Sequence, residues 1–169
     1  MELVEGGDLA VYLADRGRLN VSETCEILLP LISAVDAAHA VGVVHRDIKP
    51  SNVLLGRAPH GGHHPKLVDF GISKLSEDEA GPSLTTSHAT LGTAAYMAPE
   101  QIRDAKRADA RSDQYALGVL LYECLTGRKP FSGSSAYEVM HAVLTAPSEQ
   151  ASSIIRDLPP ELNAIIVRA

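Results

Sequence analysis

The sequence predicts a mainly α protein with a few short β-strands (α+β). Apolar residues recur at helical spacing in several segments, whereas the strand-like runs are only two or three residues long. The 169 residues are 45% hydrophobic and 21% charged, which is typical of one ordered domain with a sizeable core. With a net charge of −6 and no basic cluster, we expect no nucleic-acid partner.

The expected helices differ in how much of their surface is apolar. "LAVYLADRG" reads as a short helix ended by Gly17, and a longer helix follows with Ser22 as its N-cap and Gly42 after its end. Pro30 should kink that helix or mark its true start. "SDQYALGVLLYECLTG", with Ser112 as N-cap, is apolar on nearly every side, which predicts a helix in the middle of the core. Two further helices are expected in "SAYEVMHAVL" and "PPELNAIIVRA".

Strand-like runs lie at 43–44, 53–55 and 66–68, with polar turns between them. The second turn, "GRAPHGGHHP", holds three histidines that either bind a metal or, as we prefer, lie at the solvated tip of a hairpin: His60, His63 and His64. From about residue 70 to 95 the chain has no apolar period, which at this length favours a functional loop. Cys25 and Cys124 sit among apolar residues and are expected to be buried thiols.

The stretch "VVHRDIKPSNVLL" concentrates reactive side chains on one loop. Asp47, Lys49 and Asn52 lie within six residues, and Asp69 of "VDFG" follows the third strand-like run. Asp and Asn oxygens suit Mg²⁺, a lysine neutralises phosphate charge, and an acid left over can accept a hydroxyl proton. These are the groups that phosphoryl transfer needs. Each residue alone could be an ordinary turn former, but their joint spacing favours the site.

Four motifs occur in a fixed order: "HRDIKPSN", "DFG", "GTAAYMAPE" and "SDQYALG". In that order they resemble the C-terminal, large lobe of a protein kinase, over essentially the whole chain. Lys49 in this loop and "GT" before "AAYMAPE" are similar to the motifs of serine/threonine kinases. The sequences "MAPEQI" and "SDQYALGVLLYECLTGRKPF" resemble those of bacterial kinases of this type. The resemblance implies a partial kinase domain over residues 1–169, with an activation segment at 69–100 and the small β-lobe absent.

The resemblance also implies roles at the phosphates. Asp47 would be the catalytic base and Lys49 the phosphate contact, while Asn52 and Asp69 would hold the Mg²⁺ (or Mn²⁺) of ATP. Thr93 would bond to Asp47 and Lys49. Arg46 would pair with a phosphorylated loop residue, and there are four candidates for that modification: Thr85, Thr86, Ser87 and Thr90.

Other implied roles concern the nucleotide and the scaffold. "MELV" would be the hinge, where backbone groups of Glu2 and Val4 meet adenine, with Asp8 near the ribose and Leu54 under the base. The residues with implied supporting roles are His45 and Phe70, which would stack, Asp113, which would hold the "HRD" loop, and Glu100, whose arginine partner would lie beyond Ala169. Asp113 could instead be a simple helix N-terminal acid.

A kinase also needs a Gly-rich loop, a strand lysine and a helix glutamate, and we find none of them in this sequence. We therefore expect truncation at both ends of the kinase domain, with the small lobe in a longer parent. Two functions compete: a serine/threonine kinase fragment, whose parent transfers the ATP γ-phosphate to protein Ser/Thr hydroxyls, or a non-catalytic lobe that binds or regulates. We expect a cytoplasmic location, since this chain has neither a signal peptide nor a membrane segment; an anchor could lie elsewhere in the parent.

Overall fold

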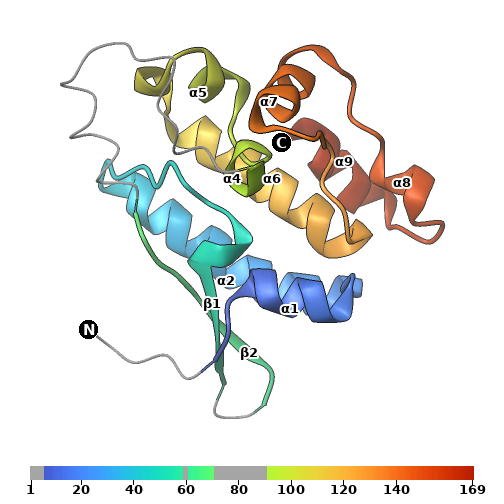
Figure 1. The fold of residues 1–169 in the computed structure, drawn as a ribbon. Helices are drawn as coiled ribbons and strands as arrows, with labels where there is room; N and C mark the ends of the chain where they lie inside the picture. Colours follow the sequence, from blue (N-terminus) through green and yellow to red (C-terminus); the bar gives the residue numbers. More distant parts are fainter. Residues whose placement is uncertain (1–5, 59–60, 71–90) are drawn as a thin grey trace.

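Helices dominate the computed structural model, which describes residues 6–58, 61–70 and 91–169 (Figure 1). The chain runs in this order: α1 (Leu9–Arg16), α2 (Val21–Ala40), a 3-10 turn at Pro50–Asn52, β1 (Val53–Arg57), β2 (His63–Leu67), α4 (Leu91–Ala94), α5 (Pro99–Arg103), a 3-10 turn at Ala105–Arg107, α6 (Ala110–Thr126), α7 (Ala136–Thr145), α8 (Ala151–Ile154) and α9 (Pro160–Arg168). The expected mainly α class is confirmed.

Helix α6 is the central element, as its apolar pattern predicted. It packs on α2 at one side and on α8 and α9 at the other, and Figure 1 shows it between the two groups. Leu120 and Cys124 are fully buried on it. Its N-cap is Asp109, whose carboxylate accepts from the Arg111 N–H at 2.8 Å, so the expected N-cap at Ser112 was wrong. Gly127 ends the helix in the left-handed conformation, as expected.

Helix α2 is continuous over 20 residues and passes through Pro30. Pro30 is exposed at mid-helix, so it does not mark the start of the helix. The N-cap is Asn20, whose side chain accepts from the Glu23 N–H at 2.9 Å, and the expected cap at Ser22 was therefore wrong. A buried stripe faces α6 and β2: Thr24, Ile27, Leu28, Leu31 and Val35.

Strands β1 and β2 form an antiparallel hairpin that runs from the pair Val53–Leu67 to the pair Arg57–His63. The strands are longer than expected and take in His63 and His64, which the sequence had placed in the turn; His60 lies outside the described residues. Residues 43–44 form no strand, because the Val43 N–H bonds to the Ala38 carbonyl as part of the exit from α2.

The segment before α1 lies against β1. The Leu55 N–H donates to the Gly7 carbonyl at 2.9 Å, and Asp8 pairs with Leu54 in an isolated bridge. A Cβ on Gly6 would lie 2.0 Å from the Leu55 carbonyl oxygen, so this approach requires glycine. It brings Asp8 beside Leu54, the two residues that the sequence had assigned to one ligand.

The two cysteines differ in burial. Cys124 is fully buried in the core between α2 and α6, as expected. Cys25 is only half-buried, because it lies beside the inward stripe of α2, so the expectation of a buried thiol was too strong there. None of the helices within the described ranges is long and apolar enough to cross a membrane.

Candidate active site

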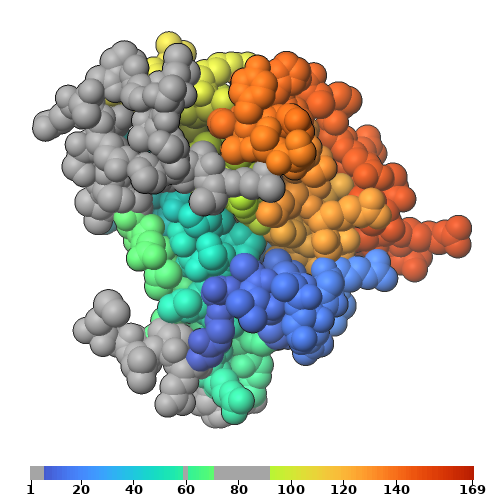
Figure 2. Space-filling model, viewed as in Figure 1, coloured from blue at the N-terminus to red at the C-terminus, as the bar shows by residue number. Residues whose placement is uncertain are grey.

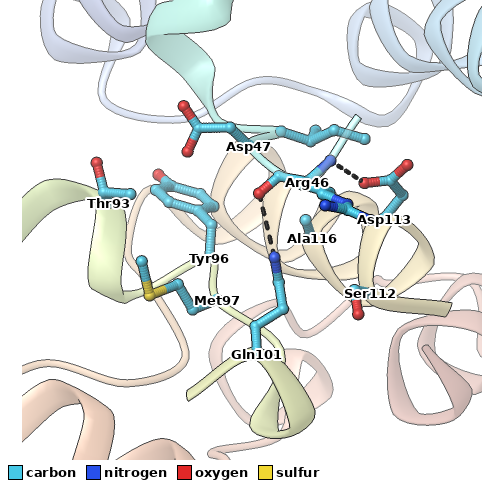
Figure 3. Close-up of a pocket in the computed structure, with 10 residues that line it drawn as sticks. Arg46, Asp47, Thr93, Tyr96, Met97, Gln101, Ser112, Asp113 and Ala116 are labelled. Carbon is cyan, nitrogen blue, oxygen red and sulfur yellow. Dashed lines mark hydrogen bonds between the residues drawn. The ribbon is translucent and has the colours of Figure 1, made fainter. Parts of the chain in front are cut away.

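The loop of residues 45–49 is fastened to α6 by one carboxylate. Asp113, only 1% exposed, accepts from the backbone N–H groups of His45 and Arg46, both at 2.8 Å. It also lies 2.7 Å from Nε2 of His39, at the end of α2. The contact to the loop was predicted, and it excludes the alternative of a simple helix-start acid (Figure 3).

Arg46 and Asp69 are the non-glycine residues with positive φ in the described part of the chain, at 67° and 58°. This conformation is unfavourable for residues with a side chain and persists only where neighbours impose it. At Arg46 they do: Asp113 binds its N–H, and Gln101 Nε2 donates to its carbonyl at 3.1 Å (Figure 3). The backbone that leads into Asp47 is thereby fixed.

Asp47 lies at the centre of a hydrogen-bond network. Lys49 Nζ donates to Asp47 Oδ2 at 2.9 Å and reaches Thr93 Oγ1 at 3.3 Å. Asn52 Nδ2 donates to the Asp47 carbonyl at 2.8 Å and to Oδ2 at 3.2 Å. In Figure 3 the Asp47 carboxylate and the Thr93 hydroxyl lie on the same side of the pocket. The structure thus brings together Asp47, Lys49, Asn52 and Thr93, four of the residues to which the sequence had given roles at the phosphates.

His45 connects this loop to the end of β2. Its ring nitrogen Nε2 lies 3.0 Å from the Val68 carbonyl, and Nδ1 accepts from the Asp47 N–H at 3.3 Å. Because Nδ1 accepts, Nε2 carries the proton and donates to Val68. The ring lies 4.5 Å from the Phe70 ring centroid, so the predicted stacking contact is present.

Asn52 and Asp69 are candidates for holding a metal ion. The Val68 N–H donates to the Asn52 carbonyl at 2.9 Å, which brings Asp69, the next residue, to the Asn52 loop. Asn52 is buried with its Nδ2 committed to Asp47, so Oδ1 is the atom left to face a cation. Asp69 is exposed. Two hard oxygens suit Mg²⁺, which keeps waters and takes phosphate oxygens as its other ligands.

The predicted nucleotide contacts are only partly described. Asp8 caps α1, where Oδ1 accepts from the Val11 N–H at 2.8 Å, and Leu54 is half-buried beside it. Six predicted residues lie outside the described ranges: Glu2 and Val4 at the hinge, and the modification candidates Thr85, Thr86, Ser87 and Thr90.

Comparison with known families agrees with this geometry. The sequence model described as "Protein kinase domain" matches residues 1–167. The chain belongs to the protein kinase family. Relatives of this kinase chain include the serine/threonine-protein kinase PknL of Mycobacterium tuberculosis, 41% identical over 169 residues, and the serine/threonine-protein kinase PkaA of Streptomyces coelicolor, 44% identical over 168 residues.

The match extends over the whole kinase chain but over only part of each relative. The aligned region is 100% of this chain and 40% of PknL, and 99% of this chain and 29% of PkaA. A probable serine/threonine-protein kinase PknB of Corynebacterium glutamicum is 37% identical, and the chain covers 26% of it. The chain thus spans less than half the length of these curated kinases.

Glu100 of the kinase "APE" motif already has a donor. The Ser112 hydroxyl, in the first turn of α6, donates to Glu100 Oε1 at 2.8 Å. The sequence had assigned Ser112 to a cap, so this contact was missed. The Glu100 carboxylate therefore has a hydrogen-bond donor within this chain, although no arginine partner is seen among the described residues.

Three further groups in the kinase site escaped the sequence reasoning. His39 and Gln101 support the loop through Asp113 and Arg46. Glu123, in α6, accepts a hydrogen bond from the Tyr96 hydroxyl. Burial raises the pKa of Glu123, while the Tyr96 hydrogen bond and Lys129 oppose the rise. Of these three residues, Glu123 could have been found from the sequence, because it is an acidic residue in an otherwise apolar stretch of α6.

Proposed function

We propose that residues 1–169 are the catalytic large-lobe part of a serine/threonine protein kinase that transfers the γ-phosphate of ATP to Ser or Thr hydroxyls of proteins. The single observation that carries the proposal is the network around Asp47. The Asp47 carboxylate accepts hydrogen bonds from the Lys49 ammonium and the Asn52 amide. The same ammonium also donates to the hydroxyl of Thr93, in the segment that precedes "APE". An ordinary surface turn has no need of this arrangement.

Asp47 would accept the proton of the attacking hydroxyl. The Asn52 amide and the Lys49 ammonium hold the carboxylate in one orientation. This positioning matters because phosphoryl transfer depends mainly on orientation and electrostatic stabilisation. Lys49, whose ammonium lies between Asp47 and Thr93, would neutralise charge on the transferred group. Thr93, which shares the Lys49 ammonium with Asp47, would help to define which hydroxyl is accepted.

The donor set fits the Mg²⁺ that accompanies ATP. Asn52 Oδ1 and the Asp69 carboxylate would hold it. When bound, the ion would supply positive charge that offsets the negative charge of the phosphates. Mn²⁺ has the same preference for oxygen ligands and would serve as a substitute. Asp8 and Leu54, which lie side by side, would contact the ribose and the base, and backbone groups of Glu2 and Val4 the adenine.

Three further parts of the proposal rest on kinase chemistry. The Gly-rich loop, strand lysine and helix glutamate are absent from this sequence and would come from a small lobe outside it. The segment 69–100 would be the activation segment. Phosphate on Thr85, Thr86, Ser87 or Thr90 would pair with Arg46. A cytoplasmic location, where ATP is available, is part of the same proposal.

The test compares two proteins under Mg-ATP labelled on the γ-phosphate, with a mixture of acidic and basic acceptor proteins. One is residues 1–169, and the other is translated from the same reading frame with its upstream and downstream sequence included. We expect phosphoserine or phosphothreonine only from the longer protein, and loss of it in Asp47→Asn and Asp69→Asn. Lys106→Asn, on the exposed surface, is the control. Robust transfer by residues 1–169 alone would contradict the need for a small lobe.

Binding gives a second readout on residues 1–169. Residues 1–169 would supply only the large-lobe side of the nucleotide site, so the phosphates of bound ATP would be exposed to water. There the attraction between charges about 4 Å apart falls to roughly 1 kcal/mol. At about 1 mM Mg-ATP, a dissociation constant above about 1 mM stabilises the fold by less than about 0.4 kcal/mol. We therefore expect almost no shift in melting temperature. A longer protein that binds Mg-ATP well but transfers nothing would favour the alternative, a non-catalytic binding or regulatory lobe.

A further inference from the structure

A groove of about 450 Å³ begins at the catalytic loop and runs between α1 and the end of α6. Lys49 and Thr93 line one end of it, and Lys129 lines the other. In the space-filling view the blue surface of α1 lies next to the orange surface at the end of α6 (Figure 2). The groove is therefore continuous with the site proposed above, and its far end lies beyond the reacting atoms.

Contacts link the two ends of the groove. Lys49 Nζ, paired with Asp47, reaches the Thr93 hydroxyl, and the Tyr96 N–H donates to the Thr93 carbonyl at 3.1 Å. The Tyr96 hydroxyl then donates to Glu123, and Lys129 Nζ lies 5.3 Å from the centroid of the Tyr96 ring. A polypeptide whose hydroxyl lies at Asp47 would thus place a flanking residue near Lys129.

The charged side chains that line the groove differ in whether other groups of the protein already bind them. Lys49 is engaged by Asp47. Glu123 is partly buried and has the Tyr96 hydroxyl on its carboxylate. Lys129 is half-exposed, and no carboxylate among the described residues lies within ion-pair distance of its Nζ. Of the charged groups that line the described part of the groove, Lys129 is the one available to a ligand.

We propose that Lys129 selects acceptor polypeptides that carry an acidic residue near the phosphorylated Ser or Thr, and that Glu123 moderates this preference. The inference rests on the proposed function, because it takes Asp47 as the point where the acceptor hydroxyl lies. The negative charge of Glu123 interacts with Lys129 inside the groove and so weakens the attraction of Lys129 for an acidic ligand. The same carboxylate, held by Tyr96 and screened by Lys129, is poorly placed to bind an arginine of the acceptor.

The experiment measures peptide binding by residues 1–169, with no need for phosphoryl transfer. Three fluorescent peptides have one serine each, with acidic, neutral or basic flanks, and their dissociation constants come from fluorescence anisotropy. A partly exposed ion pair changes affinity by up to about fivefold, and attraction and repulsion act in opposite directions. We therefore expect the acidic peptide to bind about tenfold more tightly than the basic one, less so in high salt.

Variants test whether the groove causes this preference, measured as the ratio of the dissociation constant of the basic peptide to that of the acidic peptide. Lys129→Gln should bring this ratio close to one, and Lys129→Arg should keep it. Glu123→Gln should raise it, because Lys129 then loses its internal attraction. Lys106→Gln removes the same charge from an exposed position outside the groove and should change nothing. Circular dichroism of each variant checks that it is folded.

Four outcomes would overturn the inference: no binding of any peptide at millimolar concentration, tighter binding of the basic peptide, a ratio unchanged in Lys129→Gln, or a ratio lost equally in Lys106→Gln. Failure of the proposed function looks different. In that case the acidic preference at Lys129 would remain in the binding data, while the longer protein would transfer no phosphate to the acidic peptide.

Discussion

Asp113 shows how much one side chain organises here. Its carboxylate is buried on α6 and gathers hydrogen-bond donors from two other parts of the chain, the end of α2 and the catalytic loop. Hydrogen bonds to a charged group are worth more than neutral ones, and leaving the donors unpaired costs more than the bonds contribute. The position of Asp47 therefore depends on a residue that touches no substrate.

We expect Asp113→Asn to destabilise the fold by about 2–4 kcal/mol, because an amide has one acceptor oxygen where the carboxylate has two, and its NH₂ group faces N–H donors. Asp109→Asn is the matched control, four residues earlier at the exposed N-cap. Asn caps helices as well as Asp does, so that change should cost far less stability than Asp113→Asn. Urea unfolding measures both, and equal losses would contradict the role given to Asp113.

The two thiols should differ in reactivity. Burial, followed by the charges of Glu123 and Glu23, raises the pKa of Cys124 to about 12, so almost no thiolate forms at neutral pH. Cys25 is half-buried. A colorimetric thiol reagent should therefore titrate one cysteine in the native protein and two in denaturant. Loss of the native reaction in Cys25→Ser would assign it, and a fast second thiol in the native state would contradict the packing of α6.

Sequence reasoning succeeded best for residues whose chemistry is unusual in their local pattern. Asp47, Lys49 and Asn52 stood out as charged and amide groups between apolar runs, and the structure brings them together with Thr93. His39 and Gln101 could not be found in this way. Their importance comes from which distant backbone atoms they meet, and those contacts exist only after α2, α5 and α6 have packed.

At the scale of elements, helix types were predictable and their first residues were not. Both N-caps were misplaced: Asn20 caps α2 where Ser22 was expected, and Asp109 caps α6 where Ser112 was expected. In each case two good capping residues lie two or three positions apart, and local preference does not separate them. For α6 tertiary structure decides, because Ser112 binds Glu100 inside the fold.

The hairpin shows a similar limit. The histidines of the turn suggested a solvated tip, yet the structure places His63 in β2 against Tyr12 of α1, with its N–H donating to Glu26 of α2 at 2.6 Å. The Tyr12 ring and the His63 ring meet edge to face at 4.9 Å. The hairpin is thereby packed on both helices.

Two neighbouring glycines of that hairpin test this packing. Both have positive φ, 88° at Gly61 and 83° at Gly62, so alanine costs about 1 kcal/mol of backbone strain at either one. Only at Gly62 would the new Cβ also meet Glu26, 2.2 Å from Oε1. We expect Gly62→Ala to lower the unfolding free energy by about 1–2 kcal/mol more than Gly61→Ala. Equal effects in urea unfolding would mean that Glu26 simply moves aside.

For the whole molecule, Glu123 should make stability depend on pH. Burial raises its pKa in the folded state, so the folded protein holds a proton more tightly than the unfolded chain does. The resulting contribution to stability is fully present below the ordinary glutamate pKa and is lost as the pH rises through the higher, folded-state pKa.

Glu123→Gln cannot ionise and lacks this dependence. The unfolding free energy of the wild type, relative to that of the variant, should therefore fall as the pH rises above the ordinary glutamate pKa of about 4.3. Urea unfolding of both proteins across this rise in pH gives the difference, in which the other titrating groups cancel. A difference that rises with pH would mean that Tyr96 and Lys129 stabilise the carboxylate more than burial opposes it.

The attachment of the catalytic loop to Asp113 also has a consequence for exchange with solvent deuterium. A loop amide ordinarily exchanges whenever its short segment fluctuates. The N–H groups of His45 and Arg46 are bonded to a carboxylate on the central helix, so they open only when the loop parts from α6 or α6 itself unfolds. We expect them to exchange as slowly as amides in the middle of α6. Those two amides would then report, in the free protein, whether the loop that presents Asp47 is intact.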